Sequence, residues 1–149
     1  MSPQPAPRIA ITAQVDDGAR LEDRVVVGPA VVFTNDRYPR AINPDGSCNS
    51  GDDWHAVGVT VGTGAAIGVR SVCIAPVEIG EWALVATGAT VTRAVLEYVR
   101  VTGSPAHLVG WVGRAGARLV ADGDDFRCLI AGELYRKLDG ALSPVESGA

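Results

Sequence analysis

The sequence predicts an all-β protein in the form of a parallel β-helix, and two observations carry this prediction. The first is composition: the 149 residues are 47% hydrophobic but only 5% aromatic, with 18 glycines and 9 prolines. Such a chain favours small side chains stacked in narrow layers over a core of bulky aromatic rings. The second is a six-residue repeat over residues 9–96, which neither a 3.6-residue helical period nor a two-residue strand period explains.

Two positions of the six-residue repeat have a constant character. The first position is apolar in every repeat, and the residue four places later is small or β-branched. The first positions are Ile9, Val15, Leu21, Val27, Phe33, Val61, Ile67, Cys73, Ile79, Val85 and Val91. The later positions are Ala13, Ala19, Val25, Val31, Ala65, Ser71, Val77, Ala83, Ala89 and Val95. Each repeat would form a short strand and a corner, and three repeats would form one triangular coil. Coils would stack about 4.8 Å apart, giving about four coils in all.

The repeat is interrupted between Arg37 and Trp54 by a segment rich in Pro, Gly, Asn, Asp and Ser. This composition predicts a loop, residues 37–54, extruded from one corner of the helix. We therefore expect a flexible N-terminus at 1–8, a β-helix domain at 9–112 and a small β-rich tail at 113–149. Asp122-Gly123 and Asp139-Gly140 are expected to form hairpin turns in that tail.

Charge and hydropathy exclude several classes of partner. The net charge of −4 and a pI near 5.1 give no electrostatic footprint for nucleic acid or an anionic membrane surface. No apolar run reaches the roughly 20 residues that a membrane span needs. The start of the sequence lacks the apolar core of a signal peptide, and three cysteines do not make a disulfide framework. These features predict a cytoplasmic protein that binds neither nucleic acid nor membrane.

Three segments carry a resemblance to a known family. GARLEDRVVVGPAVVFTNDRYPRA is similar to the segment before the active-site loop of sugar-nucleotide N-acetyltransferases in the hexapeptide-repeat acyltransferase family. VTVGTGAAIGVRSVCIAPVEIGEWALVATGATVTRAVLEYVRVTGSPAHLVGWV resembles their closing coils, and within it residues 101–106 stand where the family has a V-x-G-N-P-A turn, with Ser104 in place of the Asn. The family acetylates amino-deoxy sugars carried on dTDP or UDP. The resemblance implies a left-handed β-helix, a homotrimer and acetyl-CoA as the cosubstrate.

The motif Phe33-Thr34-Asn35-Asp36, extended by Arg37-Tyr38-Pro39-Arg40, carries the expected acceptor site. By resemblance, Asn35 lies near the sugar amine, and its carboxamide would accept a hydrogen bond from that amine. Asp36 would accept the proton or balance a cationic amine. Asn and Asp are also common turn residues, so both have a structural reading. Thr34, Tyr38 and Arg40 are expected to contact the substrate.

The two histidines have separate interpretations. His55 follows the loop and is a candidate general base, which would suit the hexapeptide O-acetyltransferases that deprotonate a hydroxyl. The alternative for His55 is a structural hydrogen bond at the loop base. His107 follows the Gly-Ser-Pro-Ala turn, where the resembled family often has Arg or Lys, and is read as a surface residue. Two histidines cannot supply the three zinc ligands of the γ-class carbonic anhydrases, which share this fold.

The resemblance also places the acetyl-CoA site. In the family the pantetheine arm follows backbone groups of the late coils in the groove between subunits. By position this points to Gly68, Ala86, Gly88 and the turn Gly103-Ser104-Pro105. Arg93 would meet a CoA phosphate, or else be a solvated surface cation.

The tail has the outline of a small zinc ribbon that some members of the family carry. Three of its four ligand positions are Gly113, Ala115 and Ala131, and only Cys128 remains. One thiolate cannot hold a structural zinc, so we expect no metal.

The leading functional hypothesis is an acetyl-CoA-dependent N-acetyltransferase acting on an amino sugar, which the resemblance implies to be nucleotide-linked, or on a similar small amine. Family members usually have further coils before the segment that matches Gln14. We therefore expect either a reduced nucleotide site or a smaller amine. The alternatives are an O-acetyltransferase with His55 as base and a non-catalytic β-helix module that binds a partner.

Overall fold

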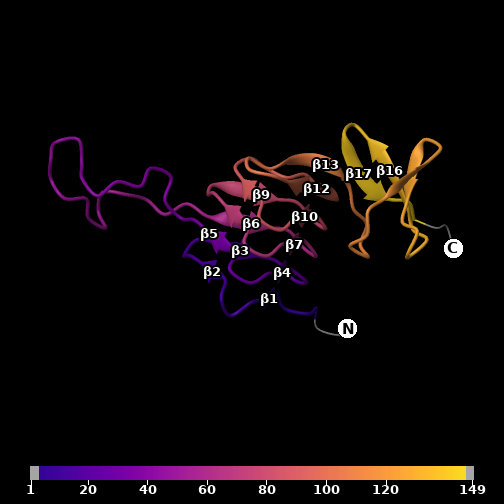
Figure 1. The fold of residues 1–149 in the computed structure, drawn as a ribbon, viewed down its shortest axis with the longest axis horizontal. Coiled ribbons are helices and arrows are strands. Elements are labelled where there is room, and N and C mark those ends of the chain that lie inside the picture. Colours follow the sequence, from indigo (N-terminus) through magenta and orange to yellow (C-terminus); the bar gives the residue numbers. More distant parts are fainter. Residues whose placement is uncertain (1–3, 147–149) are drawn as a thin grey trace.

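The computed structural model describes residues 4–146, and all regular structure in this range is β-strand (Figure 1). Face A contains β1 (Arg8–Ile9), β4 (Val26–Val27), β7 (Ala66–Ile67), β10 (Leu84–Val85), β12 (Val99–Thr102) and β13 (His107–Trp111). Face B contains β2 (Gln14–Val15), β5 (Val32–Phe33), β8 (Val72–Cys73) and β11 (Thr90–Val91). Face C contains β3 (Arg20–Leu21), β6 (Val59–Val61) and β9 (Val77–Ile79).

The three faces form a triangular prism of about four coils, as the repeat predicted. Consecutive strands go to consecutive faces, and each strand pairs in parallel with the strand one coil further on. Val95 adds a single parallel bridge to Ile79 on face C of the last coil. β13 turns back antiparallel against β12 and closes face A at the C-terminal end.

The interior of the prism is built from the two predicted repeat positions. Every first-position side chain from Val27 to Val91 is at most 2% exposed. The small residues four places later form the rest of the same apolar cluster, and Ser71, which is fully buried, donates its hydroxyl to the Ala86 carbonyl at 3.0 Å. The first coil is different: Ile9 is 48% exposed, because β1 has a strand neighbour on one side only. Burial of each layer therefore depends on the layers stacked against it.

Most corners of the prism are tight turns whose third residue has positive φ. Arg24, Ala30, Arg70 and Trp82 have φ values of 62°, 55°, 58° and 57°. At the corner after β7, for example, the Ser71 N–H donates to the Gly68 carbonyl at 3.2 Å. The turn directs the following residue inward, which explains why that position is small.

The spacing between paired residues locates the interruption of the repeat. Arg8 pairs with Val26, and Ala66 pairs with Leu84, 18 positions later in each case. Val26 pairs with Ala66, 40 positions later, so 22 residues are inserted in the second coil. The insertion leaves the prism between β5 and β6 and extends far from it, as the long violet segment in Figure 1 shows. The predicted extruded loop is therefore confirmed, with wider bounds than 37–54.

We call residues 34–58 the arm, and its two ends next to the prism, residues 34–36 and 55–58, its outgoing and returning stems. Its base is closed by the Val57 N–H, which donates to the Asn35 carbonyl at 2.9 Å. Farther out, the Asn49 N–H donates to the Ala41 carbonyl at 2.9 Å, and Ile42 forms an antiparallel bridge with Cys48. The arm is thus a two-stranded ribbon without a core of its own.

The C-terminal tail is a four-stranded antiparallel sheet of β14 (Val120–Asp122), β15 (Asp125–Arg127), β16 (Leu134–Leu138) and β17 (Ala141–Pro144). Its core joins Tyr135, Leu142 and Cys128 to Tyr98 at a corner of the prism. Asp139-Gly140 forms the predicted turn between β16 and β17. The β14–β15 turn is Gly123-Asp124, one residue later than predicted, because Asp122 itself pairs with Asp125.

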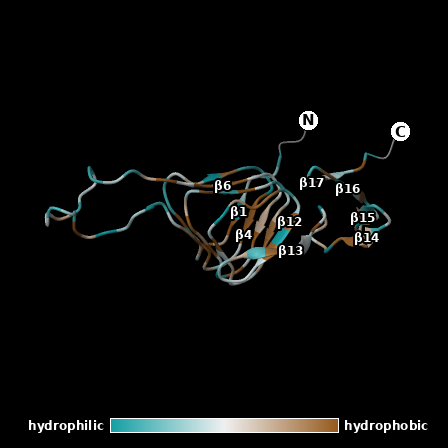
Figure 2. Cartoon of the chain, turned by 90° about the horizontal axis from the view of Figure 1, so that it is seen from above, coloured by the Kyte–Doolittle hydropathy of each residue, from teal (hydrophilic) through white to brown (hydrophobic). Residues whose placement is uncertain are grey.

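The arm and the tail leave the prism on opposite sides, both in the side view (Figure 1) and from above (Figure 2).

The predicted flexible segment 1–8 lies partly outside the described residues, which begin at residue 4. Within it, the Pro5 carbonyl accepts the Arg24 N–H at 2.7 Å, and Arg8 already belongs to β1. Across residues 4–146, we find no helix of the length and apolarity needed to cross a membrane.

Candidate functional site

The predicted acceptor residues lie at the base of the arm, at the corner between faces B and C. β5 ends at Phe33, and the Thr34 N–H continues the sheet by donating to the Cys73 carbonyl at 3.1 Å. Asn35 is half-buried, and among the described residues its carboxamide has no hydrogen-bond partner. The carboxamide is therefore free to accept or donate a hydrogen bond to a ligand.

Asp36 performs the turn role that its residue type commonly serves. Its Oδ1 accepts the Tyr38 N–H at 2.9 Å. One carboxylate oxygen is thereby engaged in shaping the start of the arm, while the other has no partner among the described residues.

His55 returns to the same end of the arm. It stands two residues before Val57, whose N–H closes the base on Asn35. The side chain is exposed and makes no hydrogen bond to any described residue, so the structural bond considered for it is not formed. The chain brings Asn35, Asp36 and His55 to one corner, on the two stems of the arm.

Tyr38 and Arg40 lie farther along the arm. Tyr38 is 75% exposed, and the Arg37 guanidinium lies 5.5 Å from its ring centroid. Arg40 is exposed and donates from Nη1 to the neighbouring Pro39 carbonyl at 2.7 Å. Neither side chain is placed against its own prism.

The predicted cofactor residues divide between two corners. On face B, Phe33 pairs with Cys73 and Cys73 with Val91. The Thr34 N–H donates to the Cys73 carbonyl and the Ile74 N–H to the Val91 carbonyl, so the pairing continues one residue beyond these strands. Arg93, two residues after Val91, therefore lies at the same end of face B as Asn35, two residues after Phe33.

Gly68, Ala86 and Gly88 belong to the other corner of face B, where face A ends. A Cβ on Gly68 would lie 2.6 Å from the Thr87 nitrogen and 2.7 Å from the Val85 oxygen. Close stacking of coils therefore already requires glycine there. Gly88 has φ of 72° and open space around it.

The turn Gly103-Ser104-Pro105 lies above this corner, against the last strand of face B. The Thr90 N–H donates to the Gly103 carbonyl at 2.9 Å, and the Ser104 hydroxyl donates to the Thr90 hydroxyl at 2.9 Å. The turn thus extends face B by one further layer, with Ser104 and Pro105 at its surface.

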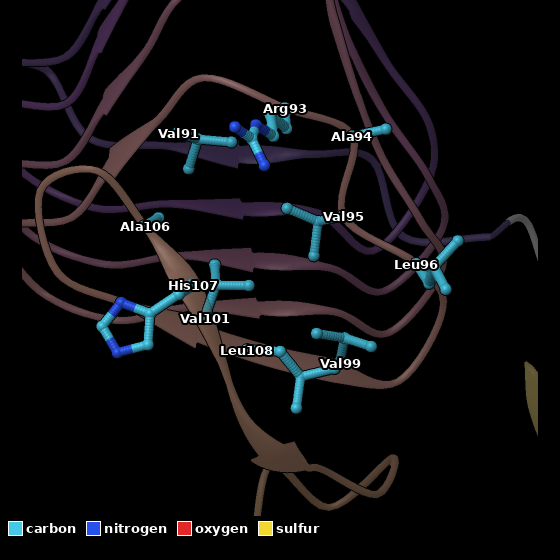
Figure 3. Close-up of a pocket in the computed structure, with 10 residues that line it drawn as sticks. All are labelled: Val91, Arg93, Ala94, Val95, Leu96, Val99, Val101, Ala106, His107 and Leu108. Carbon is cyan, nitrogen blue, oxygen red and sulfur yellow. The ribbon is translucent and has the colours of Figure 1, made fainter. Parts of the chain in front are cut away.

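Two hollows at the C-terminal end of the prism connect Arg93 to this turn. One, of about 330 Å³, has an apolar floor formed by Val95, Val99 and Val101. The other, of about 500 Å³, is lined by Thr92, Arg93, Ser104, Pro105, Ala106 and His107. In Figure 3, Arg93 and His107 flank the first hollow from different sides. His107 was not among the predicted site residues, although its place after the Gly-Ser-Pro-Ala turn was the signal that could have found it.

Side chains fill the space beside Gly113, one of the positions at which a zinc ribbon has a ligand. A Cβ on Gly113 would lie 3.0 Å from Leu119 Cδ2 and 3.1 Å from the Tyr135 hydroxyl oxygen. That hydroxyl accepts the Arg114 N–H at 2.9 Å and donates to Glu133, and burial, reinforced by Glu133, raises the pKa of Tyr135 to about 12. The residues at these positions therefore fit a neutral tyrosine and not a metal. No group of three or more potential ligands occurs within residues 4–146.

The three faces of parallel strands form a left-handed parallel β-helix, with the arm at one of its corners. The chain is 37% identical over 80 residues to dTDP-3-amino-3,6-dideoxy-α-D-galactopyranose 3-N-acetyltransferase from Aneurinibacillus thermoaerophilus. That match covers 54% of this chain and 41% of the relative, so the chain matches less than half of the relative's length. No family model matches the sequence.

Solved structures share the fold at low identity. Galactoside acetyltransferase in complex with coenzyme A is similar with a TM-score of 0.56 and 19% identity, over 69% of this chain and 50% of that one. A hexapeptide-repeat-containing acetyltransferase from Vibrio cholerae is similar with a TM-score of 0.51 and 18% identity, over 70% and 62%. The resemblance read from the sequence is confirmed by these matches.

Proposed function

We propose that this protein is an acetyl-CoA-dependent N-acetyltransferase that acts on the amine of an amino sugar or a similar small amine. The observation that carries the proposal is the match to a dTDP-amino-sugar N-acetyltransferase, on a chain whose Asn35 carboxamide is free at the arm base. A nucleotide-linked acceptor is the first candidate, because that relative's name specifies one.

The chemistry requires a neutral amine held near a thioester carbonyl. The Asn35 carboxamide oxygen would accept a hydrogen bond from the amine and direct its lone pair at the carbonyl carbon. The new C–N bond forms as the C–S bond breaks, and coenzyme A leaves as a thiolate that is protonated to the thiol by the proton passed on from the amine. Asp36, whose second carboxylate oxygen is free among the described residues, would take the proton that the amine loses.

The cosubstrate would lie near the C-terminal end of the prism. Arg93 and His107 provide positive charge or hydrogen-bond donors beside the two hollows, and the Gly103-Ser104-Pro105 turn forms a wall of one of them. Gly68, Ala86 and Gly88 would border the same path at the corner between faces A and B.

A homotrimer is part of the proposal. Several outward-facing residues on and beside faces A and B are apolar: Val26, Val69 and Ile74 are each about two-fifths exposed in the single chain. Tyr38 and Arg40 are carried away from their own prism by the arm, so a substrate contact through them would be to a site on a neighbouring subunit.

We also propose a cytoplasmic location, residues 9–112 as the catalytic unit and residues 113–149 as a tail without metal.

The test is acetyl transfer measured by release of free coenzyme A thiol, with dTDP-linked and free 3-amino sugars as acceptors. Asn35→Ala should lower kcat about 100-fold, since a group that orients the amine is lost. Asp52→Ala is the control and should stay near wild type, because the Asp52 side chain is exposed on the arm and makes no hydrogen bond to any described residue. Transfer to none of these amines by the wild-type protein would reject the proposal.

O-acetylation with His55 as base is the second candidate, because His55 is exposed at the arm base without a structural hydrogen bond to any described residue. His55→Ala separates the two reactions. An O-acetyltransferase would lose nearly all turnover on hydroxyl acceptors, whereas the N-acetyltransferase would keep much of its turnover on amines.

A further inference from the structure

The two stems of the arm are tied to one turn in the coil above. The Ala75 N–H donates to the Thr34 hydroxyl oxygen at 2.9 Å, on the outgoing stem. The Val77 N–H lies 3.4 Å from the Gly58 carbonyl, on the returning stem. Together with the Val57-to-Asn35 bond, these contacts fix the distance between the stems.

The Thr34 contact is unusual among these because it depends on a side chain. Ala75 is 3% exposed, and the corner at residues 75–76 takes its N–H out of the strand pairing. A buried backbone N–H needs a hydrogen-bond acceptor. Thr34 supplies it, and at the same time its own N–H holds the end of β5 to Cys73. The residue that follows, Asn35, thereby has its backbone fixed on both sides.

We propose that Thr34 is a positioning residue, whose hydroxyl holds the Ala75 N–H so that the Asn35 carboxamide and Asp36 face the acceptor amine. This inference rests on the proposed function and replaces direct substrate binding as the role of Thr34. Its hydroxyl oxygen acts on the backbone of the prism, and the catalytic groups are its neighbours.

The chain offers a matched control. The Thr12 hydroxyl accepts the Ala30 N–H at 3.1 Å, which is the same type of contact between neighbouring coils. It lies at the corner between faces A and B, far along the chain from the arm. Thr12→Val removes an equivalent hydrogen bond without touching the arm base.

The experiment compares T34V, T34S and T12V. T34V keeps the shape of the side chain but loses the acceptor, and should lower kcat at least about tenfold with KM for acetyl-CoA within about twofold of wild type. T34S keeps the acceptor and should restore most of kcat. T12V should leave both constants unchanged. Equal losses in T34V and T34S, or a T34V loss no greater than that of T12V, would overturn the inference.

Hydrogen exchange provides a second readout that does not need turnover. In the wild type the Ala75 and Val57 amides should exchange slowly, as prism amides do, and T34V should speed up exchange at Val57 whereas T12V should not. If the wild type transfers no acetyl group, the proposed function fails and this exchange comparison alone decides the role of Thr34. If T34V does not fold, fast exchange of Ala75 in the wild type would overturn the inference, and slow exchange would support it.

Discussion

The prism and the arm are made from neighbouring stretches of one chain, yet they are held together by different forces. Phe33, the last residue of β5, is completely buried, whereas Tyr38, five residues later, is 75% exposed. The prism is stabilised by stacked apolar layers, while the arm relies on hydrogen bonds among Asn, Asp and Ser side chains. The candidate acceptor residues lie at the boundary between the apolar prism and the hydrogen-bonded arm. A rigid scaffold with a polar extension is a common way to place functional groups.

The largest predicted difference in stability is between truncating an aromatic side chain in the prism and truncating one in the arm. Phe33→Ala leaves a cavity in the second coil and should lower the free energy of unfolding by about 3–5 kcal/mol. Tyr38→Ala should change it by less than about 0.5 kcal/mol. Urea unfolding of both variants is the measurement, and comparable losses would mean that the arm contributes to the core.

Adding one methyl group at Gly58 tests whether the returning stem of the arm is packed against the first coil. A Cβ on Gly58 would lie 2.0 Å from the Gly18 carbonyl oxygen in the coil below, so Gly58→Ala must displace backbone. It should cost about 1–3 kcal/mol in thermal or urea unfolding. Gly51→Ala, with nothing within 4 Å of its Cβ, is the control and should be neutral. A neutral Gly58→Ala would show that the returning stem is not packed on the first coil.

Acid should loosen the arm while the prism stays intact, and this is the smallest effect that we predict. Hydrogen bonds from the Ser47 side chain and N–H hold the pKa of Asp45 below its usual 3.8. Because the folded pKa is depressed, the stabilisation is present above pH 3.8 and is lost as the pH falls through the lower folded pKa. NMR titration should show Ser47 shifts changing at that pH while Val85 shifts do not. Asp45→Asn should remove this titration step, and its persistence would assign the step to another group.

The sequence predicted the prism well because the six-residue repeat is a local pattern. Inward-facing residues such as Val61 and Val85 could be assigned from spacing alone, and they are buried. The same pattern could not reveal that Ile9 is exposed, because burial depends on a neighbouring coil and not on the repeat itself. It also missed the shortened last coil, where Leu84 pairs with Arg100 only 16 positions later.

The site was predictable as a set of residue types but less so as an arrangement. The motif around Asn35 marked the corner at which the arm leaves the prism. The interruption suggested bounds of 37–54, whereas the stems extend to Thr34 and Gly58, since hydrogen bonds to Ala75 and Val77 in another coil define them. Arg93 was grouped with Gly68 by resemblance, but the strand register places it at the Asn35 end of face B. The bounds of the arm and the place of Arg93 depend on contacts between coils, which a pattern along the sequence does not show.

The three tryptophans of the chain are distributed so that each reports on a different region. Trp54 is half-buried near the arm base. Trp82 lies across Gly64 at a prism corner with the Arg114 guanidinium 5.8 Å from its ring centroid, and Trp111 lies between Phe126 and Lys137 at the tail. Variants that retain one indole each would give separate fluorescence signals for arm, prism corner and tail. Ligand-induced quenching could then be assigned to a region of the molecule without any label.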